Sequence, residues 1–224
     1  MVEAIQSMAT KPRAKLGEKA QDVFVSLWAS LFYSGKTVGK SLIVCAGGSG
    51  EGASTVACGL AMAGSAPIGS ARVALVDFNL RSPTVHQVFG LPQSPGIGEI
   101  VMEKLPPESA AQRVCEGLDV YTAGKLQKRS PDSLRSQAVA ELLSTLAGGY
   151  DQVIVDVAPV NQYPDAAAIV SVVKDAVLVA HTDRTPREAV VQAKKRLENA
   201  GGRLVGIVLN LRTYPIPKFL YKRV

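Results

Sequence analysis

The chain has 224 residues, of which 47% are hydrophobic and 20% are charged, and its formal net charge is +6. This length and composition are typical of one soluble globular domain that buries a sizeable core. No run of about 18 apolar residues is present that could span a membrane, and residues 1–10 lack the apolar centre of a signal peptide. We therefore expect a cytoplasmic protein.

The first part of the chain leads into a strand that ends at a glycine-rich loop. Residues 1–16 are basic, and we expect them to form a mobile leader. Between residues 17 and 33, apolar side chains recur every three or four positions, which predicts a helix that lies on the sheet or on a partner. The first strand follows at Leu42, Ile43 and Val44, and Ser54 and Thr55 then open an alanine-rich helix.

Strand, loop and helix in this order are typical of a phosphate-binding loop. Glycines let the backbone curl with its N–H groups inward, and the helix N-terminus adds a positive dipole. In the pattern G-x-x-x-x-G-K-[ST], Gly47 and Gly52 match and Ser54 supplies the hydroxyl, but Ala53 stands at the lysine position. Loss of a charge-assisted hydrogen bond costs roughly 1.5–3 kcal/mol, so we expect weak nucleotide binding. If the loop is considered alone, the alternative interpretation is a glycine-rich turn between strand and helix that binds no ligand.

Two later strands each end in an aspartate. Residues 71–77 (ARVALVD) lead to Asp77, with Asn79 and Arg81 just beyond it, at the edge where open α/β sheets bind ligands. Residues 151–160 (DQVIVDVAPV) end their apolar run at Asp156, as a Walker B strand does, where a carboxylate can hold a magnesium-bound water. Together with the glycine loop, these strands predict a nucleotide and magnesium site.

The remaining elements continue the alternation of strands and helices. We expect helices at residues 96–104, 134–147, 165–173 and 186–200, and strands at 118–124, 175–181 and 204–210. This alternation predicts an α/β fold with a doubly wound, mainly parallel sheet. The tail of residues 211–224 has four basic side chains, no acid and three aromatic residues. It favours an acidic partner or the inner membrane surface, with a solvated tail as the alternative.

Other chemistry finds no support in the sequence. The three cysteines, Cys45, Cys58 and Cys115, lack metal-ligand spacing, and we interpret them as reduced thiols, two of them in core elements. His86 and His181 show no spacing typical of a metal site; His181 could face the nucleotide edge, but we favour a role in supporting a loop. No G-x-S-x-G elbow is present, so serine hydrolase chemistry is not indicated.

On these motifs the chain resembles the bacterial tyrosine autokinase (BY-kinase) family, cytosolic P-loop proteins of capsule and exopolysaccharide synthesis within the deviant-Walker class that includes MinD and ParA. GEGAST at 50–55 resembles the family's GEGKST, VALVDFNLRSP at 73–83 its hhhDxDxR, and VIVDVAP at 153–159 its hhhDxxP. YPDAAAIV at 163–170 and GIVLN at 206–210 resemble later segments, and the latter implies that Asn210 lies near the base. The resemblance runs from about residue 22 to the end.

The resemblance implies ATP or ADP with Mg²⁺ as ligands. The implied nucleotide-binding residues are Gly47, Gly48, Ser49, Gly50, Glu51, Gly52, Ala53, Ser54, Thr55 and Asn210. The implied metal ligands are Ser54, Asp77 and Asp156, and the candidates for a catalytic role are Asp77, Asn79 and Arg81.

Several functional positions depart from the family pattern. Ala53 replaces the catalytic lysine and Asn79 the second aspartate of hhhDxDxR. The oligomerisation motif E-x-x-R-x-x-R falls on Asp22, Val25 and Trp28, so we do not expect the family's ring; a homodimer is the alternative. Only Tyr214 and Tyr221 remain of the tyrosine-rich tail, and Gly48 stands at the lysine position of MinD and ParA.

We expect residues 17–210 to form a P-loop domain that binds nucleotide weakly, is catalytically impaired, and regulates the cytoplasmic end of a membrane polysaccharide co-polymerase. The protein would be cytoplasmic or peripheral at the inner membrane, without a nucleic-acid partner. Three alternatives stay open. One is an active autokinase or ATPase in which Arg81, Lys125 or a partner's arginine supplies the cation. The others are an adaptor that binds no nucleotide and a MinD-like positioning ATPase that uses the basic tail on membranes.

Overall fold

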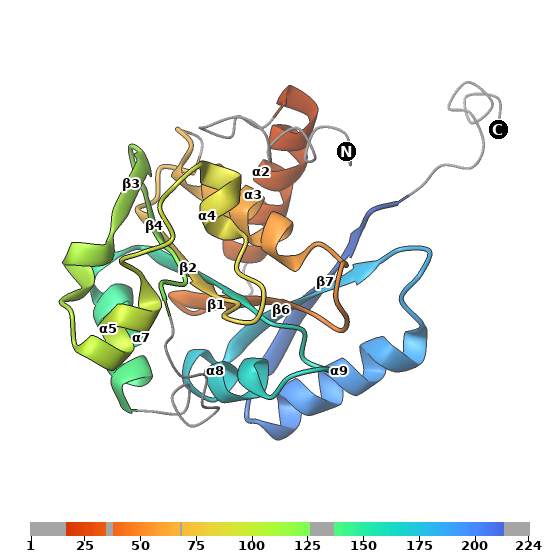
Figure 1. Cartoon of the computed structure of the whole chain (residues 1–224). Helices are drawn as coiled ribbons and strands as arrows, with labels where there is room; N and C mark the ends of the chain where they lie inside the picture. Colours follow the sequence, from red (N-terminus) through yellow and green to blue (C-terminus); the bar gives the residue numbers. More distant parts are fainter. Residues whose placement is uncertain (1–16, 35–37, 68, 126–136, 213–224) are drawn as a thin grey trace.

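A seven-stranded sheet forms the centre of the computed structural model, which describes residues 17–34, 38–67, 69–125 and 137–212 (Figure 1). The leader and residues 213–224 of the tail lie outside these ranges. The strand order is β3-β4-β2-β5-β1-β6-β7, and only β3 runs antiparallel to its neighbour. The strands are β1 Ser41–Ala46, β2 Val73–Phe78, β3 Gln112–Cys115, β4 Leu118–Tyr121, β5 Gln152–Val157, β6 Asp175–His181 and β7 Arg203–Asn210. The predicted doubly wound, mainly parallel α/β fold is confirmed.

Helices cover both faces of the sheet, as Figure 1 shows. On one face lie α2 Glu18–Phe32, α3 Ala53–Ser65 and α4 Val85–Phe89, and on the other α5 Ile97–Glu103, α7 Gln137–Gly149, α8 Asp165–Val173 and α9 Arg187–Asn199. Two apolar layers result, one on each side of the strands. The central strands are buried on both faces, which is why they are continuous apolar runs such as Leu42–Ala46. No helix in the described ranges is long and apolar enough to cross a bilayer.

Most predicted elements are found within a few residues of their expected bounds. The strand expected at 118–124 ends at Tyr121, because the carbonyls of Thr122 and Ala123 accept hydrogen bonds from the first turn of α5 instead. Three short elements were not predicted: α4, a 3-10 helix at Pro107–Ala110, and β3. Each has only four or five residues, too few to display a hydrophobic period.

The N-terminal helix α2 packs on α3, within the same chain. Phe24 and Trp28 of α2 are 4% and 3% exposed and lie over Gly59 and Gly64 of α3. A Cβ atom on either glycine would come within 2.3 Å of a ring atom of its aromatic neighbour. The two helices therefore approach closely because α3 has no side chain at these two points. Trp28, which aligns with the last arginine of the family's oligomerisation motif, faces the interior.

Candidate phosphate-binding site

The glycine loop lies at the carboxyl edge of the sheet, where the chain changes direction. From β1 the chain passes through α3 to β2 on one side, whereas β5 leads through α8 to β6 on the other side of β1. Open α/β sheets bind ligands at such a switch point. A hollow of about 260 Å³ is found there. It is lined by Ala46, residues 48–55, Asn79, Arg81, Ser82, Thr84, Val157, Pro159 and Tyr163.

The loop, residues 47–55, directs backbone donors into this hollow. Gly50 and Gly52 have φ angles of +79° and +89°, in the left-handed region that glycine adopts without strain. Gly52 is the N-cap of α3 and offers no side chain to accept the free N–H groups of the first turn. These donors and the positive end of the helix dipole therefore remain available to an anion.

The loop is held from behind by Glu51 and Asn210. The Glu51 carboxylate accepts hydrogen bonds from the Gly47 N–H (3.0 Å) and the Thr185 hydroxyl (2.7 Å). The Asn210 amide donates to the Glu51 carbonyl (3.0 Å), and a Cβ on Gly52 would lie 2.2 Å from the Asn210 nitrogen. Asn210 is 3% exposed, so its side chain supports the loop; its contact with a base stays a prediction.

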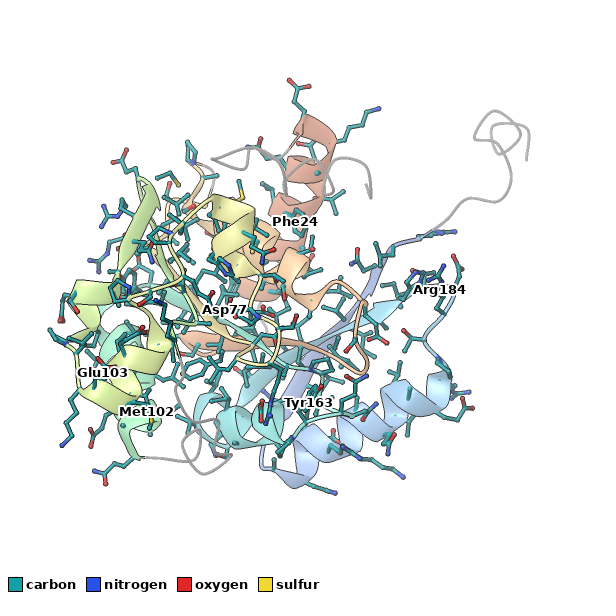
Figure 2. The ribbon with its side chains drawn as sticks, viewed as in Figure 1. Phe24, Asp77, Met102, Glu103, Tyr163 and Arg184 are labelled. Atoms are coloured by element: carbon teal, nitrogen blue, oxygen red, sulfur yellow. The ribbon has the colours of Figure 1, made fainter. Side chains whose placement is uncertain are left out.

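Two buried carboxylates lie on neighbouring strands near the carboxyl edge of the sheet, and neither is among the residues that line the hollow. Asp77 and Asp156 are paired in the register of β2 and β5, and both are fully buried. Asp77 accepts the backbone N–H groups of Asn79 (3.1 Å) and Val85 (3.3 Å). Neither oxygen of Asp156 has a hydrogen-bond partner among the described residues. Figure 2 labels Asp77 at the centre of the molecule.

Burial raises the pKa of both carboxyls, because desolvation disfavours the charged form. The negative charge of Asp77 raises the pKa of Asp156 further. The Ser54 hydroxyl is near enough to lower this pKa, but it forms no hydrogen bond with Asp156. A buried carboxylate with no partner is costly, so it points to a missing ligand.

The donor set fits a magnesium ion. Mg²⁺ takes oxygen ligands and is held in nucleotide sites by one or two protein groups, with phosphates and waters completing the shell. The unpaired Asp156 oxygens and the Ser54 hydroxyl supply such groups. Within the described ranges no cluster of three or more acidic, histidine or cysteine side chains is present, so phosphates and water would have to supply most of the ligands.

Arg81 is the sole positively charged residue among those that line the hollow. Its guanidinium donates to both oxygens of Asp165, at 2.9 and 3.1 Å, and lies 5.0 Å from the centre of the Tyr163 ring. The Asp165 side chain is 1% exposed and the Arg81 side chain 27%, so the carboxylate is withdrawn from water while the guanidinium keeps contact with it. Of the two residues predicted as substitute cations, Arg81 reaches the site, whereas Lys125 does not line it and is fixed through its backbone N–H to Glu99.

Sequence reasoning missed residues that line the hollow or hold the loop. Tyr163 and Pro159 come from the segment between β5 and α8, and Gln162 there accepts a hydrogen bond from the Ser49 hydroxyl (2.7 Å). The proline of the D-x-x-P pattern was the available signal for this segment. Nothing in the sequence marked Thr185, which meets Glu51 only through folding. The thiols predicted to be in core elements, Cys45 and Cys58, are buried, whereas Cys115 is exposed.

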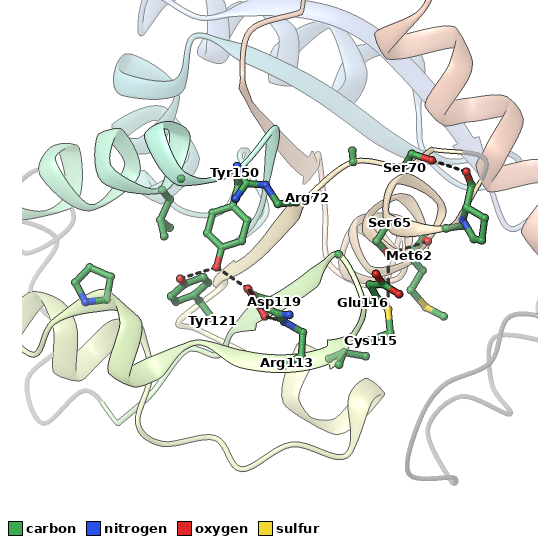
Figure 3. Close-up of a pocket in the computed structure, with 18 of the residues that line it drawn as sticks. Met62, Ser65, Ser70, Arg72, Arg113, Cys115, Glu116, Asp119, Tyr121 and Tyr150 are labelled. Atoms are coloured by element: carbon green, nitrogen blue, oxygen red, sulfur yellow. Dashed lines mark hydrogen bonds and ion pairs between the residues drawn. The ribbon is translucent and has the colours of Figure 1, made fainter.

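A larger hollow of about 1360 Å³ opens at the opposite, amino edge of the sheet (Figure 3). Four of its polar groups satisfy one another: Asp119 pairs with Arg113 and accepts the Tyr150 hydroxyl (2.8 Å), which lies 3.1 Å from the Tyr121 hydroxyl. Unlike Asp156, none of these four partnered groups points to a missing ligand.

The sheet, its switch point and the glycine loop define a P-loop protein of the deviant-Walker class. A plasmid partition protein from Borrelia burgdorferi bound to AMPPNP shares this fold, with a TM-score of 0.61, 17% identity and coverage of 82% of this chain and 79% of that one. The chimerical protein CapA2B2 is more similar, with a TM-score of 0.79 and 26% identity over 96% of this chain and 92% of its own.

The tyrosine-protein kinase YwqD of Bacillus subtilis is 33% identical over 172 residues, which are 76% of this chain and 72% of YwqD. No family model matches the chain. The likeness to YwqD nevertheless shows the family: this chain belongs to the bacterial tyrosine-protein kinase (BY-kinase) family of capsule and exopolysaccharide biosynthesis proteins.

Proposed function

We propose that this chain is a nucleotide-binding regulator of capsule or exopolysaccharide assembly that transfers phosphoryl groups poorly or not at all. One observation carries the proposal: the glycine loop is followed by buried aspartates near the ends of β2 and β5, but Ala53 stands where a lysine would enter the hollow. Binding through N–H groups and Mg²⁺ survives this replacement. Stabilisation of the charge that develops during transfer does not, because it depends on a cation held at that place.

A calorimetric titration with ATP and Mg²⁺, followed by mass spectrometry for phosphotyrosine after incubation with ATP, tests this function. We expect weak binding that depends on Mg²⁺, and no phosphotyrosine. Tight binding of ATP by the unaltered protein would show that a substitute cation exists. Phosphotyrosine in the protein alone would contradict the proposed loss of transfer, and no binding at all would favour an adaptor that uses no nucleotide.

An active enzyme is the second candidate, because Arg81 lines the hollow. Its bidentate contact with the buried Asp165 argues against release, since breaking a buried ion pair is strongly destabilising. An arginine from a partner molecule avoids this difficulty. ATP turnover that appears only with the partner present would support this candidate over ours.

The partner that we propose is the cytoplasmic end of a membrane polysaccharide co-polymerase, reached with the help of the basic tail. The tail beyond Arg212 lies outside the described residues, so this rests on its composition: Lys218, Lys222 and Arg223 stand beside Phe219 and Tyr221. Removal of residues 218–224 should abolish recruitment to the partner or to anionic vesicles and leave the melting temperature unchanged. A lowered melting temperature with recruitment intact would refute this role of the tail. Recruitment to vesicles without the partner would favour a MinD-like role.

A further inference from the structure

We propose that the free edge of β7 pairs with β7 of a second copy of this chain, so that two sheets join across a two-fold axis. β7 is the last strand of the sheet, and in the described part of the chain it pairs only with β6 (Figure 1). The backbone N–H and C=O groups on its other side are therefore open to another strand. The inference goes beyond the proposed function, because no residue of β7 lines the hollow.

The two edges of the sheet differ in how well they are protected. β3 has four residues, contains Arg113, and is shifted in its pairing with β4 between Arg113 and Cys115. Short length, charge and a bulge are the features by which natural proteins protect an edge strand. β7 has eight residues, and its stretch 204–210 (LVGIVLN) contains neither charge nor proline. Its register shift lies before Gly206, so residues 206–210 form a regular edge.

The apolar side chains of β7 are uncovered as well. Ile207 and Leu209 are 47% and 66% exposed, and Leu209 is the most exposed large apolar residue in the described ranges. They lie on one face of the sheet, because they are two positions apart. An uncharged apolar strand fits this edge, and β7 itself is such a strand. The chain's own tail fits it less well, because three of the seven residues 218–224 are basic.

The backbone sets the register of the pairing. The Asn210 carbonyl accepts the Thr182 N–H (3.0 Å) on the β6 side. Because successive residues direct their N–H and C=O groups to opposite sides, Ile207 and Leu209 direct theirs to the free edge. A two-fold axis at Val208 then places Ile207 opposite the partner's Leu209, and each such pair exchanges both backbone hydrogen bonds. The two exposed side chains therefore cover one another.

Charge and the protected second edge both favour a closed dimer. Arg203, at the start of β7, donates to both oxygens of Asp175 (2.8 and 2.9 Å), so its charge is offset within its own copy. Because β3 is protected, each copy offers one open edge. An antiparallel contact of that edge with itself is isologous, so it closes at two copies and does not continue into a fibre.

Cysteine cross-linking of the full chain tests this contact. In an antiparallel pair without mutual hydrogen bonds the Cα atoms lie about 4.5 Å apart, within the roughly 4.4–6.8 Å that a disulfide requires. Val208→Cys should therefore form a disulfide-linked dimer with oxidised glutathione, and dithiothreitol should reverse it. Val191→Cys is the matched control: this residue of α9 is 42% exposed, so random collision would link it more readily than the half-buried position 208. The unaltered chain, with its exposed Cys115, gives the background.

Light scattering at rising protein concentration tests the contact without a covalent link. We expect the unaltered chain to dimerise and the double variant Ile207→Lys, Leu209→Lys to stay monomeric. The axis at Val208 places lysine opposite lysine in this variant, and like charges directly opposite each other destabilise strand pairing. Val191→Lys adds a charge away from the edge and should keep the dimer. Circular dichroism shows whether each variant folds; if the double variant does not, the cysteine variants decide.

Four outcomes would overturn the inference. They are a monomer in every protein, a dimer that survives both lysines, an assembly larger than a dimer, and cross-linking of Val208→Cys only after removal of residues 213–224, which would assign the edge to the tail. A chain that is monomeric alone but loses its polysaccharide co-polymerase partner in the double lysine variant would assign the edge to that partner, again against a second copy. Failure to bind nucleotide would overturn the proposed function and leave this inference standing.

Discussion

At the scale of single residues, the buried aspartates and the missing lysine belong to one arrangement. Asp156 has no hydrogen-bond partner among the described residues, and Asp77 lies beside it across one strand pairing. If these groups served stability alone, an unpaired buried carboxylate would only cost free energy of folding. The cost is explained if a cation and a phosphate complete the site, as we propose.

Asp156→Asn should stabilise the ligand-free protein at pH 8 and reduce the pH dependence of its stability. Because the pKa of Asp156 is raised on folding, the folded state binds more protons than the unfolded state above the unfolded pKa of about 3.9. Stability is therefore greatest below that pKa and is lost as the pH rises toward the folded pKa. Urea unfolding of both proteins at pH 5.5 and pH 8 measures the effect.

Asparagine is the matched replacement because it keeps the shape and removes the charge. We expect the unaltered protein to be less stable at pH 8 than at pH 5.5 by a larger margin than the variant. The same variant should lose the Mg²⁺ dependence of nucleotide binding. An equal pH dependence in the two proteins would show that Asp156 is not the titrating group.

At the scale of elements, the close contact of α2 with α3 depends on two glycines. Gly59 and Gly64 are buried in α3, and the rings of Phe24 and Trp28 fill the space where side chains would stand. Helix propensity alone disfavours glycine by about 1 kcal/mol relative to alanine. Close packing of the aromatic rings outweighs this local preference.

Gly59→Ala should therefore lower the free energy of unfolding by about 1–3 kcal/mol, the range for overpacked cores, although alanine is the better helix former. Gly148→Ala is the control, because a Cβ at this exposed position of α7 meets nothing within 4 Å. It should raise the free energy of unfolding by about 0.5–1 kcal/mol. Thermal or urea unfolding compares the two, and a stabilised Gly59→Ala would contradict the described packing.

At the scale of the whole molecule, the position of α2 bears on assembly. The three positions that align with the family's oligomerisation motif are Asp22, Val25 and Trp28, and Trp28 is 3% exposed in the contact with α3. A side chain in the core cannot form the charge-assisted pairs that arginines make on a surface. That the chain does not form the family's ring stays a prediction, and a homodimer is the alternative assembly.

Light scattering of the purified chain, with and without nucleotide, should give a monomer or dimer. Asp22→Glu combined with Val25→Arg should not change this result, because the third position remains inside the molecule. An octamer in either protein would show that another surface closes the ring. Phosphotyrosine should remain absent in both, since the tail has no tyrosine cluster.

The sequence by itself determined the fold and the location of the candidate site. Apolar runs that end at Gly47, Asp77 and Asp156 predicted parallel strands whose carboxyl ends meet, because burial on both faces requires continuous apolar strands. It also identified Ala53 as the departure on which the functional proposals depend. Such features are local in the chain, so the printed order of residues is enough to find them.

Only the tertiary structure decided which partners these residues have. The contacts of Glu51 with Thr185, of Asn210 with the loop, and of Arg81 with Asp165 join positions 84 to 159 residues apart. No local pattern records such pairs, because they form when separate elements pack. The structure likewise showed that Arg81 is engaged, that Lys125 lies elsewhere, and that Asp156 has no partner in the described part of the chain.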